Sequence, residues 1–129
     1  MLASSVRVLL LDDNEAFSET LGLILKAHGC DVVACGDPED ALCRCRERPF
    51  DLVLLDLCMP RMDGVEVTRR LRSAGEGPRV VMTTGCMDPR IETDALSAGA
   101  HCVLHKPVDP RDILREVDAV RQQEWQAAA

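Results

Sequence analysis

The chain has 129 residues, of which 47% are hydrophobic and 29% are charged, as in one globular domain with a single core. The formal net charge of −7 disfavours contact with phosphate backbones, so we expect no direct binding to nucleic acid. No apolar stretch approaches the ~18 residues that a membrane span needs, and no signal sequence opens the chain, so we expect a cytoplasmic protein without membrane contact.

Five apolar segments are predicted to form β-strands. The first, third and fourth are nearly continuous in Leu, Val and Met, which is typical of parallel strands covered on both faces. In chain order, the predicted strands are residues 6–11, 31–35, 51–55, 79–83 and 101–105.

Helical segments follow these strands, and their ends are marked by residue type. An aspartate that precedes a proline predicts a helix start at Asp37, Asp88 and Asp109. Asp63 with Glu66 three residues later has the pattern of a capping box and predicts another start. Helix ends are predicted at three glycines, Gly29, Gly75 and Gly99.

Five alternating strand and helix units with short connections predict an α/β fold. Such units form a parallel sheet with right-handed crossovers and helices on both faces. We predict one domain over residues 1–129, with its core at about 5–123 and with 124–129 as a frayed tail or the start of a linker.

Polar side chains stand at the carboxyl ends of the predicted strands, where ligands bind in folds of this kind. Asp12 and Asp13 end the first strand, Asp56 ends the third, and Lys106 follows the fifth. Three neighbouring carboxylates repel one another, and Mg²⁺ is the hard cation that suits them. The alternative, that the two adjacent acids only end a strand and cap a helix, leaves Asp56 and Lys106 at matching strand ends unexplained.

These motifs together resemble the receiver domain of two-component response regulators. They are the paired Asp12-Asp13, the segment from Asp56 to Gly64 (D-L-C-M-P-R-M-D-G), a threonine after the fourth strand, and Lys106-Pro107. The segment from Ala95 to Ala100 (A-L-S-A-G-A) strengthens the resemblance, which covers about residues 5 to 123. The resemblance implies a flavodoxin-like, doubly wound sheet of five parallel strands in the order 2-1-3-4-5, with five helices.

The resemblance also implies a role for each site residue. Asp56 is expected to accept a phosphoryl group from a histidine kinase or a histidine phosphotransfer protein. Asp13, Asp56 and the backbone carbonyl of Cys58 are expected to bind Mg²⁺ directly, with Asp12 acting mainly through bound water. Lys106 is expected to pair with phosphoryl oxygens, and its peptide bond to Pro107 is typically cis in the family.

Thr83 and Thr84 both follow the fourth strand, and only one can supply the switching hydroxyl. In the family this hydroxyl usually lies 22 residues before the lysine, which selects Thr84 and leaves Thr83 as the alternative. Many receivers also carry Tyr or Phe three residues before the lysine, where this chain has Val103. Signalling is therefore expected to use backbone and fourth-helix movement, or to couple weakly to the output surface.

Two of the seven cysteines, Cys58 and Cys86, lie two residues past Asp56 and Thr84. The cysteines lack CxxC spacing and are odd in number, so we expect free thiols. Cys58 and Cys86 flank the expected route of attacking water, and a thiol orients water poorly. A long-lived phosphoryl group is the expected result, and a redox gate at this pair is the alternative.

The sequence therefore predicts a signalling switch rather than a metabolic enzyme, one that assists only its own phosphorylation and dephosphorylation. Its conformation is expected to change at the face formed by the fourth helix, fifth strand and fifth helix, and a homodimer is expected to form on phosphorylation. An aspartyl-phosphate hydrolase of the haloacid dehalogenase type requires D-x-D and usually a cap domain, which we do not find. A flavodoxin-type flavin carrier requires a phosphate-cradling loop in place of D-D-N-E.

Overall fold

The computed structural model describes residues 5–59, 62–73 and 77–128 of the chain. Five strands form one parallel sheet: β1 (Arg7–Leu11), β2 (Asp31–Cys35), β3 (Leu52–Asp56), β6 (Arg79–Thr84) and β7 (Cys102–His105). Their spatial order, β2-β1-β3-β6-β7, is the predicted order 2-1-3-4-5. The predicted strands agree with the observed ones to within one residue at each end.

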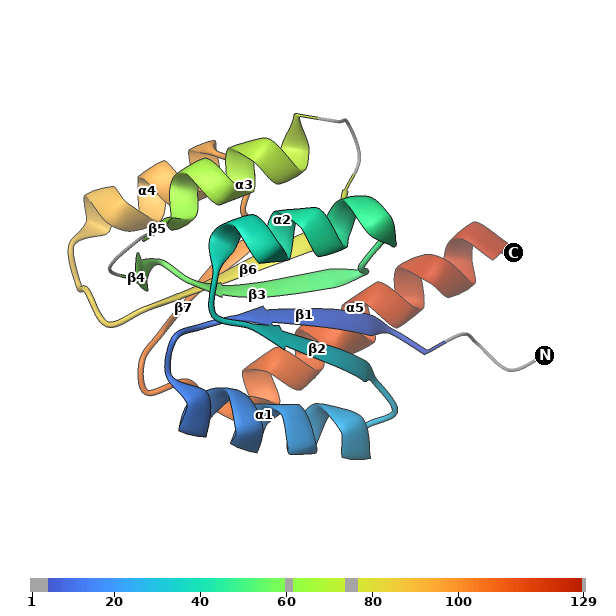
Figure 1. Ribbon diagram of the computed structural model, residues 1–129. Helices are drawn as coiled ribbons and strands as arrows, with labels where there is room; N and C mark the ends of the chain where they lie inside the picture. Colours follow the sequence, from blue (N-terminus) through green and yellow to red (C-terminus); the bar gives the residue numbers. More distant parts are fainter. Residues whose placement is uncertain (1–4, 60–61, 74–76, 129) are drawn as a thin grey trace.

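Helices cover both faces of the sheet, as the alternating pattern predicts (Figure 1). On one face lie α2 (Pro38–Glu47), α3 (Gly64–Arg72) and α4 (Pro89–Ser97). On the other face lie α1 (Glu15–Ala27) and α5 (Pro110–Ala128). Each layer buries its own apolar cluster, because successive side chains along a strand point to opposite faces.

The predicted helix starts are confirmed by the capping contacts. The side chains of Asp37, Asp63, Asp88 and Asp109 each accept a hydrogen bond from the backbone N–H two residues later. Asn14 caps α1 by accepting from the N–H of Phe17, three residues later. Glu66 does not complete the predicted capping box. It forms ion pairs with Arg69 and Arg70, at 3.4 and 3.6 Å, along the surface of α3.

The glycines mark helix ends where the structure describes them. Gly29 and Gly99 follow α1 and α4 with φ of 88° and 114°, values that other residues rarely adopt. Gly75 lies outside the described residues. α5 continues to Ala128, and the prediction that 124–129 is a tail or the start of a linker stays a prediction.

One element was not predicted. Two short antiparallel strands, β4 (Cys58–Met59) and β5 (Met62–Asp63), form a hairpin between β3 and α3. Pro60 and Arg61, which belong to the motif after Asp56, lie outside the described residues. The hairpin places Cys58 beside the carboxyl end of β3.

Candidate functional site

The three predicted acids converge at the carboxyl edge of the sheet. Asp12 and Asp13 follow β1, and Asp56 is the last residue of β3, the strand that pairs with β1. One carboxylate oxygen from each residue lies within 4.8 Å of the other two. Asp12 and Asp56 are buried, with 7% and 5% of their surface exposed, whereas Asp13 is exposed. The cluster is therefore built into the sheet edge and open to solvent at Asp13.

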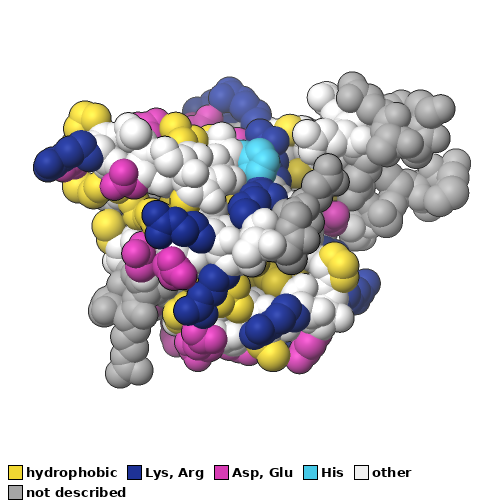
Figure 2. Space-filling model, turned by 90° about the horizontal axis from the view of Figure 1, so that it is seen from above, with side chains coloured by type: hydrophobic (Ala, Val, Ile, Leu, Met, Phe, Trp, Pro, Cys, Tyr) yellow, Lys and Arg dark blue, Asp and Glu magenta, His cyan; other side chains and the backbone are white. Residues whose placement is uncertain are grey.

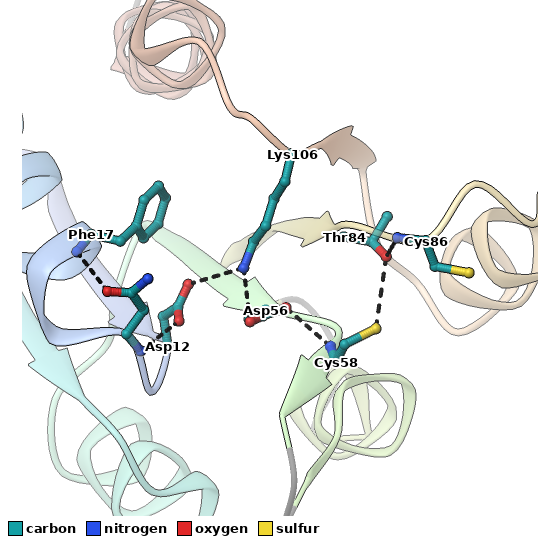
Figure 3. Close-up of polar contacts among 8 residues, drawn as sticks. Asp12, Phe17, Asp56, Cys58, Thr84, Cys86 and Lys106 are labelled. Atoms are coloured by element: carbon teal, nitrogen blue, oxygen red, sulfur yellow. Dashed lines mark hydrogen bonds and ion pairs between the residues drawn. The ribbon is translucent and has the colours of Figure 1, made fainter.

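Lys106 links the two buried acids. Its Nζ donates a hydrogen bond to Oδ2 of Asp56 at 3.0 Å and lies 3.7 Å from Oδ2 of Asp12 (Figure 3). The backbone places it there, since the N–H of Lys106 donates to the carbonyl of Thr84 at 2.8 Å and the peptide bond to Pro107 is cis. The contact with Asp56, predicted from strand ends alone, joins residues 50 positions apart.

The charges of this site act on each other's pKa. Burial lowers the pKa of Lys106, but its hydrogen bond to Asp56 and the charges of Asp12, Asp56 and Asp13 outweigh burial and raise it. The pKa of Asp12 is raised, chiefly because burial disfavours its charged form. The N–H of Asn14 and the charge of Lys106 oppose that rise. Lys106 thus remains a cation that neutralises only part of the buried negative charge.

One carboxylate oxygen is incompletely satisfied. Oδ1 of Asp12 accepts from the N–H of Asn14 at 2.9 Å, but Oδ2 is buried and accepts no hydrogen bond from any described residue. Its nearest cation, Lys106, stands at ion-pair distance. Three clustered carboxylates with an unsatisfied oxygen form an all-oxygen donor set, which fits a hard divalent cation such as Mg²⁺.

A hydroxyl and two cysteines complete the edge. Thr84 ends β6 with 1% of its surface exposed, and its Oγ1 accepts a hydrogen bond from the N–H of Cys86 at 3.0 Å. The Sγ of Cys58 lies 3.8 Å from the same oxygen, and the N–H of Cys58 donates to Oδ1 of Asp56 at 3.0 Å. Figure 3 shows the side chain of Thr84 directed toward Cys58.

Thr83, the alternative hydroxyl, has a different environment. It pairs in register with Asp56 across the sheet, but its Oγ1 is buried and contacts no hydrogen-bond partner among the described residues. Thr84 is the threonine whose hydroxyl joins the polar network around Asp56, through Cys58. The geometry thus favours Thr84 as the hydroxyl of the site.

Sequence reasoning missed two contributors to the site. Phe17 on α1 lies under the ammonium of Lys106, with its ring centroid 5.8 Å from Nζ. Asn14 both caps α1 and donates its own N–H to Asp12. The capping pattern Asn14 to Phe17 was visible in the sequence, but nothing there indicated the contact of Phe17 with a lysine 89 positions later.

Comparison with known proteins agrees with this geometry. A family described as "Response regulator receiver domain" matches residues 8–118. The chain is 38% identical to the DNA-binding response regulator MtrA of Mycolicibacterium paratuberculosis, over 88% of this chain and 50% of that protein. It is 31% identical to the alkaline phosphatase synthesis transcriptional regulatory protein PhoP of Bacillus subtilis, over 88% of this chain and 48% of that protein. The chain thus spans about half the length of these relatives.

Solved structures show the same fold. A CheY-like response regulator receiver domain protein from Methanospirillum hungatei superposes with a TM-score of 0.87 at 29% identity, covering 95% of this chain and 99% of that one. The chemotaxis response regulator CheY4 of Vibrio cholerae superposes with a TM-score of 0.81 at 25% identity, covering 90% of this chain and 98% of that one.

Proposed function

The chain belongs to the response regulator receiver domain family, and from this premise we propose that Asp56 is its phosphoacceptor. Receiver domains are the phosphoacceptor modules of two-component systems. The observation that carries the assignment is the contact of Asp56 with Lys106 at 3.0 Å inside a cluster of three carboxylates. Of the three, Asp56 alone accepts a hydrogen bond from Lys106, and its other carboxylate oxygen accepts one from the N–H of Cys58.

The phosphoryl donor we propose is a phosphohistidine of a histidine kinase or a histidine phosphotransfer protein. A carboxylate oxygen of Asp56 attacks phosphorus, the P–N bond breaks, and its electron pair leaves with the imidazole. An acyl phosphate results. Phosphoryl transfer depends mainly on positioning and charge neutralisation, and the buried Asp56 is held in place from both sides.

In this scheme Lys106 and Thr84 bind the negatively charged phosphoryl oxygens of the product. The ammonium now paired with Asp56 moves to the new phosphoryl oxygens, and the hydroxyl of Thr84 donates to one of them. To do so Thr84 gives up its contacts with Cys58 and Cys86, which draws the segment after β6 toward the site. We propose that this movement reaches α4, β7 and α5 as the output signal.

Mg²⁺ is the metal we propose for the acid cluster. Asp13, Asp56 and the backbone carbonyl of Cys58 would hold it directly, and Asp12 would act through water. When bound, the ion supplies positive charge beside the phosphoryl oxygens. The proposal rests on the all-oxygen donor set and on the unsatisfied Oδ2 of Asp12.

As a signalling switch, the domain acts on its own phosphoryl group, and we propose that it turns over no separate substrate.

Among the described residues, none of the helices has both the length and the apolar character that a membrane span requires.

Labelling with a small phosphodonor tests the assignment of Asp56. Acetyl phosphate with Mg²⁺ is expected to add one phosphoryl group to the wild-type chain and none to Asp56→Asn, as measured by intact mass. Asp94→Asn removes an exposed acid on α4, outside the cluster, and is expected to label as wild type does. Label that persists on Asp56→Asn would place the nucleophile at Asp12 or Asp13.

A further inference from the structure

A groove runs from the acid cluster along α1 and the outer strand β2. Its volume is about 720 Å³, within the range of sites that hold small ligands or several inserted side chains. Small residues border its middle: Ser18 and Gly22 on α1, Ala34 on β2, and Gly36 just after β2. A Cβ at Gly22 would meet only Val32, at an ordinary 3.9 Å, so crowding does not require glycine in the middle of α1. Its absent side chain leaves the groove open.

A buried hydroxyl in this groove has no partner. Ser18 lines the groove, is 8% exposed, and its Oγ makes no hydrogen bond with any described residue. Buried polar groups are normally satisfied, so this hydroxyl lacks something that an occupant could supply. Nearby, Leu23 is the second most exposed large hydrophobic side chain of the described chain, at 69%.

The backbone of β2 presents a free edge beside the groove. The N–H of Asp31 donates to Val6 and the carbonyl of Cys35 accepts from Asp12, so Asp31, Val33 and Cys35 direct their backbone groups toward β1. Because these groups alternate along a strand, the N–H and C=O of Val32 and Ala34 point outward. No hydrogen bond from the described residues reaches these outward groups.

Little protects this edge from further pairing. β2 contains no Pro or Lys, its one charged residue, Asp31, is its first, and its pairing with β1 is regular over five residue pairs. The side chains of Val32 and Ala34 face the groove, so a strand added here would direct alternate side chains toward α1. Added strands of this kind gain affinity from main-chain hydrogen bonds and specificity from pockets for alternate side chains.

Charge indicates which partner would fit. Four carboxylates and a single ammonium, that of Lys26, line the groove. Glu15 and Glu19 are like charges at i, i+4 on α1, an unfavourable pair, and no described residue forms an ion pair with either. On the opposite face, acids and arginines are interspersed (Figure 2), as in the pair of Glu39 with Arg70. The groove therefore has a local excess of negative charge.

We propose that the groove between α1 and β2 binds an extended, basic segment of a partner protein, which pairs with the outer edge of β2. Its main chain bonds to Val32 and Ala34, its apolar side chains lie over Gly22 and Leu23, and its Lys or Arg side chains meet Glu15 and Glu19. A second copy of this chain fits poorly, because edge-to-edge pairing would bring two acidic grooves together. The inference does not depend on phosphorylation of Asp56.

The test uses a short synthetic peptide in which every second residue is in turn Val and Lys, with Thr between them, so that Val and Lys share the face toward α1. We expect it to bind at physiological ionic strength and to shift the amide resonances of residues 15–26 and 31–36. The same peptide with alternate amides N-methylated cannot pair along one edge and is expected to bind about tenfold more weakly or less. A peptide with Glu in place of Lys is expected not to bind.

Matched variants of the chain locate the contact. Ala34→Pro removes an outward N–H without removing a bond to β1, and proline is tolerated at such edge positions. It is expected to weaken binding about tenfold or more, whereas Ala34→Ser, which keeps the amide, changes affinity about twofold or less. Glu19→Lys leaves β2 intact and is expected to weaken binding as well.

Several outcomes would overturn the proposal. Equal affinity of the N-methylated peptide, or of Ala34→Pro that retains the wild-type fold, would exclude strand pairing. Binding only by a peptide with Leu and Lys at helical spacing would identify a helix as the occupant. Resonance shifts spread over the other acidic surfaces would indicate unspecific attraction, and self-association through β2 would identify a second copy.

Discussion

At the scale of single residues, three carboxylates crowd together at the carboxyl edge of the sheet. One oxygen each from Asp12, Asp13 and Asp56 lies within 4.8 Å, and the single ammonium of Lys106 is shared between two of them. Burial is the main cause of the raised pKa of Asp12, and the charges of Asp56 and Asp13 add to it. A ligand that brings positive charge to this edge should stabilise the folded state more than the unfolded one.

We therefore expect Mg²⁺ to raise the melting temperature of the chain. Binding to the folded state alone contributes about 2.7 kcal/mol when free Mg²⁺ exceeds its Kd about 100-fold. Asp13→Asn removes an exposed ligand and should abolish most of the increase, as measured by thermal unfolding in Mg²⁺ and in EDTA. Asp94→Asn, an exposed acid outside the cluster, is expected to behave as wild type. Identical melting of the wild type in both buffers would contradict the metal site.

The lifetime of the acyl phosphate should depend on the two thiols. Hydrolysis requires in-line attack by water, and beside Asp56 Cys58 contacts Thr84 through its Sγ while Cys86 contacts it through its backbone N–H. A thiol is a weak donor and a poor acceptor, so neither organises water as an amide or carboxylate does. Cys58→Asn combined with Cys86→Glu is expected to speed autodephosphorylation about tenfold or more, which corresponds to about 1.4 kcal/mol.

Lifetimes measured with reductant present decide between the two roles of these cysteines, since reductant removes any effect of oxidation. Cys43→Ser, an exposed thiol on α2, serves as the control and is expected to leave the rate unchanged. An unchanged rate in the double variant would mean that water access is set elsewhere.

Much of this site was predictable because it follows from strand ends. The positions of Asp12, Asp56 and Lys106 depend only on which residue ends each parallel strand, and the apolar runs identify those ends. The choice of Thr84 over Thr83 could not come from periodicity. Adjacent residues point to opposite faces of a strand, which implies that only one of the two faces the site but does not say which. The choice came from spacing in the family, and the contact of Thr84 with Cys58 favours it.

At the scale of elements, the hairpin of β4 and β5 is the part that periodicity could not predict. Each strand has two residues, too short for any alternation of apolar and polar side chains to be read. Its start is fixed by one tertiary contact, from the N–H of Leu57 to the carbonyl of Thr83, and by one local contact, from the N–H of Cys58 to Asp56. Helix starts, in contrast, depend on local capping residues, which can be recognised in the sequence.

A second element-scale feature lies at the opposite end of the strands, around His101. Its Nδ1 accepts hydrogen bonds from the N–H of Val80 at 3.0 Å and from Arg72 at 2.9 Å. Burial, with the charges of Arg72 and Arg79, lowers the pKa of His101, while Glu116 on α5 opposes the decrease. The neutral ring thus joins the end of α3 to the start of β6 and β7.

This contact should make stability fall in mild acid. A histidine whose folded pKa lies below its unfolded value of about 6.5 favours unfolding as pH falls through that value, because the unfolded chain binds the proton first. His101→Asn keeps an acceptor near Nδ1 but does not titrate, so its melting temperature should fall less between about pH 7.5 and pH 5.5. Thermal unfolding of both proteins across this range checks the difference. Parallel curves would mean that His101 contributes no pH dependence.

At the scale of the whole molecule, the α4–β7–α5 face connects the site to the surface. Val103 on β7 packs against the core on the side of α2, α3 and α4, at a position where a turning aromatic residue is absent. His105 at the end of β7 lies 3.6 Å from Glu92 on α4. Movement at Thr84, which pairs with His105 in the sheet, therefore has a direct route to α4 through backbone and charge.

We expect this movement to create a homodimer contact on the α4–β7–α5 face. Met87, just before α4, and Leu96, within it, are exposed at 76% and 45%, and such side chains favour burial at an interface. Beryllofluoride with Mg²⁺ should raise the mass measured by sedimentation toward that of a dimer in the wild type, and not in Asp56→Asn.

Two surface variants locate that contact. Leu96→Lys places a charge on the expected interface and should weaken dimerisation about tenfold or more, since a buried unpaired ammonium is costly. Leu23→Lys makes the same change at a more exposed leucine on α1, which covers the other face of the sheet, and should leave dimerisation unchanged. If the treated wild type stays monomeric, the switch acts on a different partner. If Leu23→Lys disrupts the dimer and Leu96→Lys does not, the copies meet through α1, because an added charge weakens a dimer only where the substituted residue is buried in the interface.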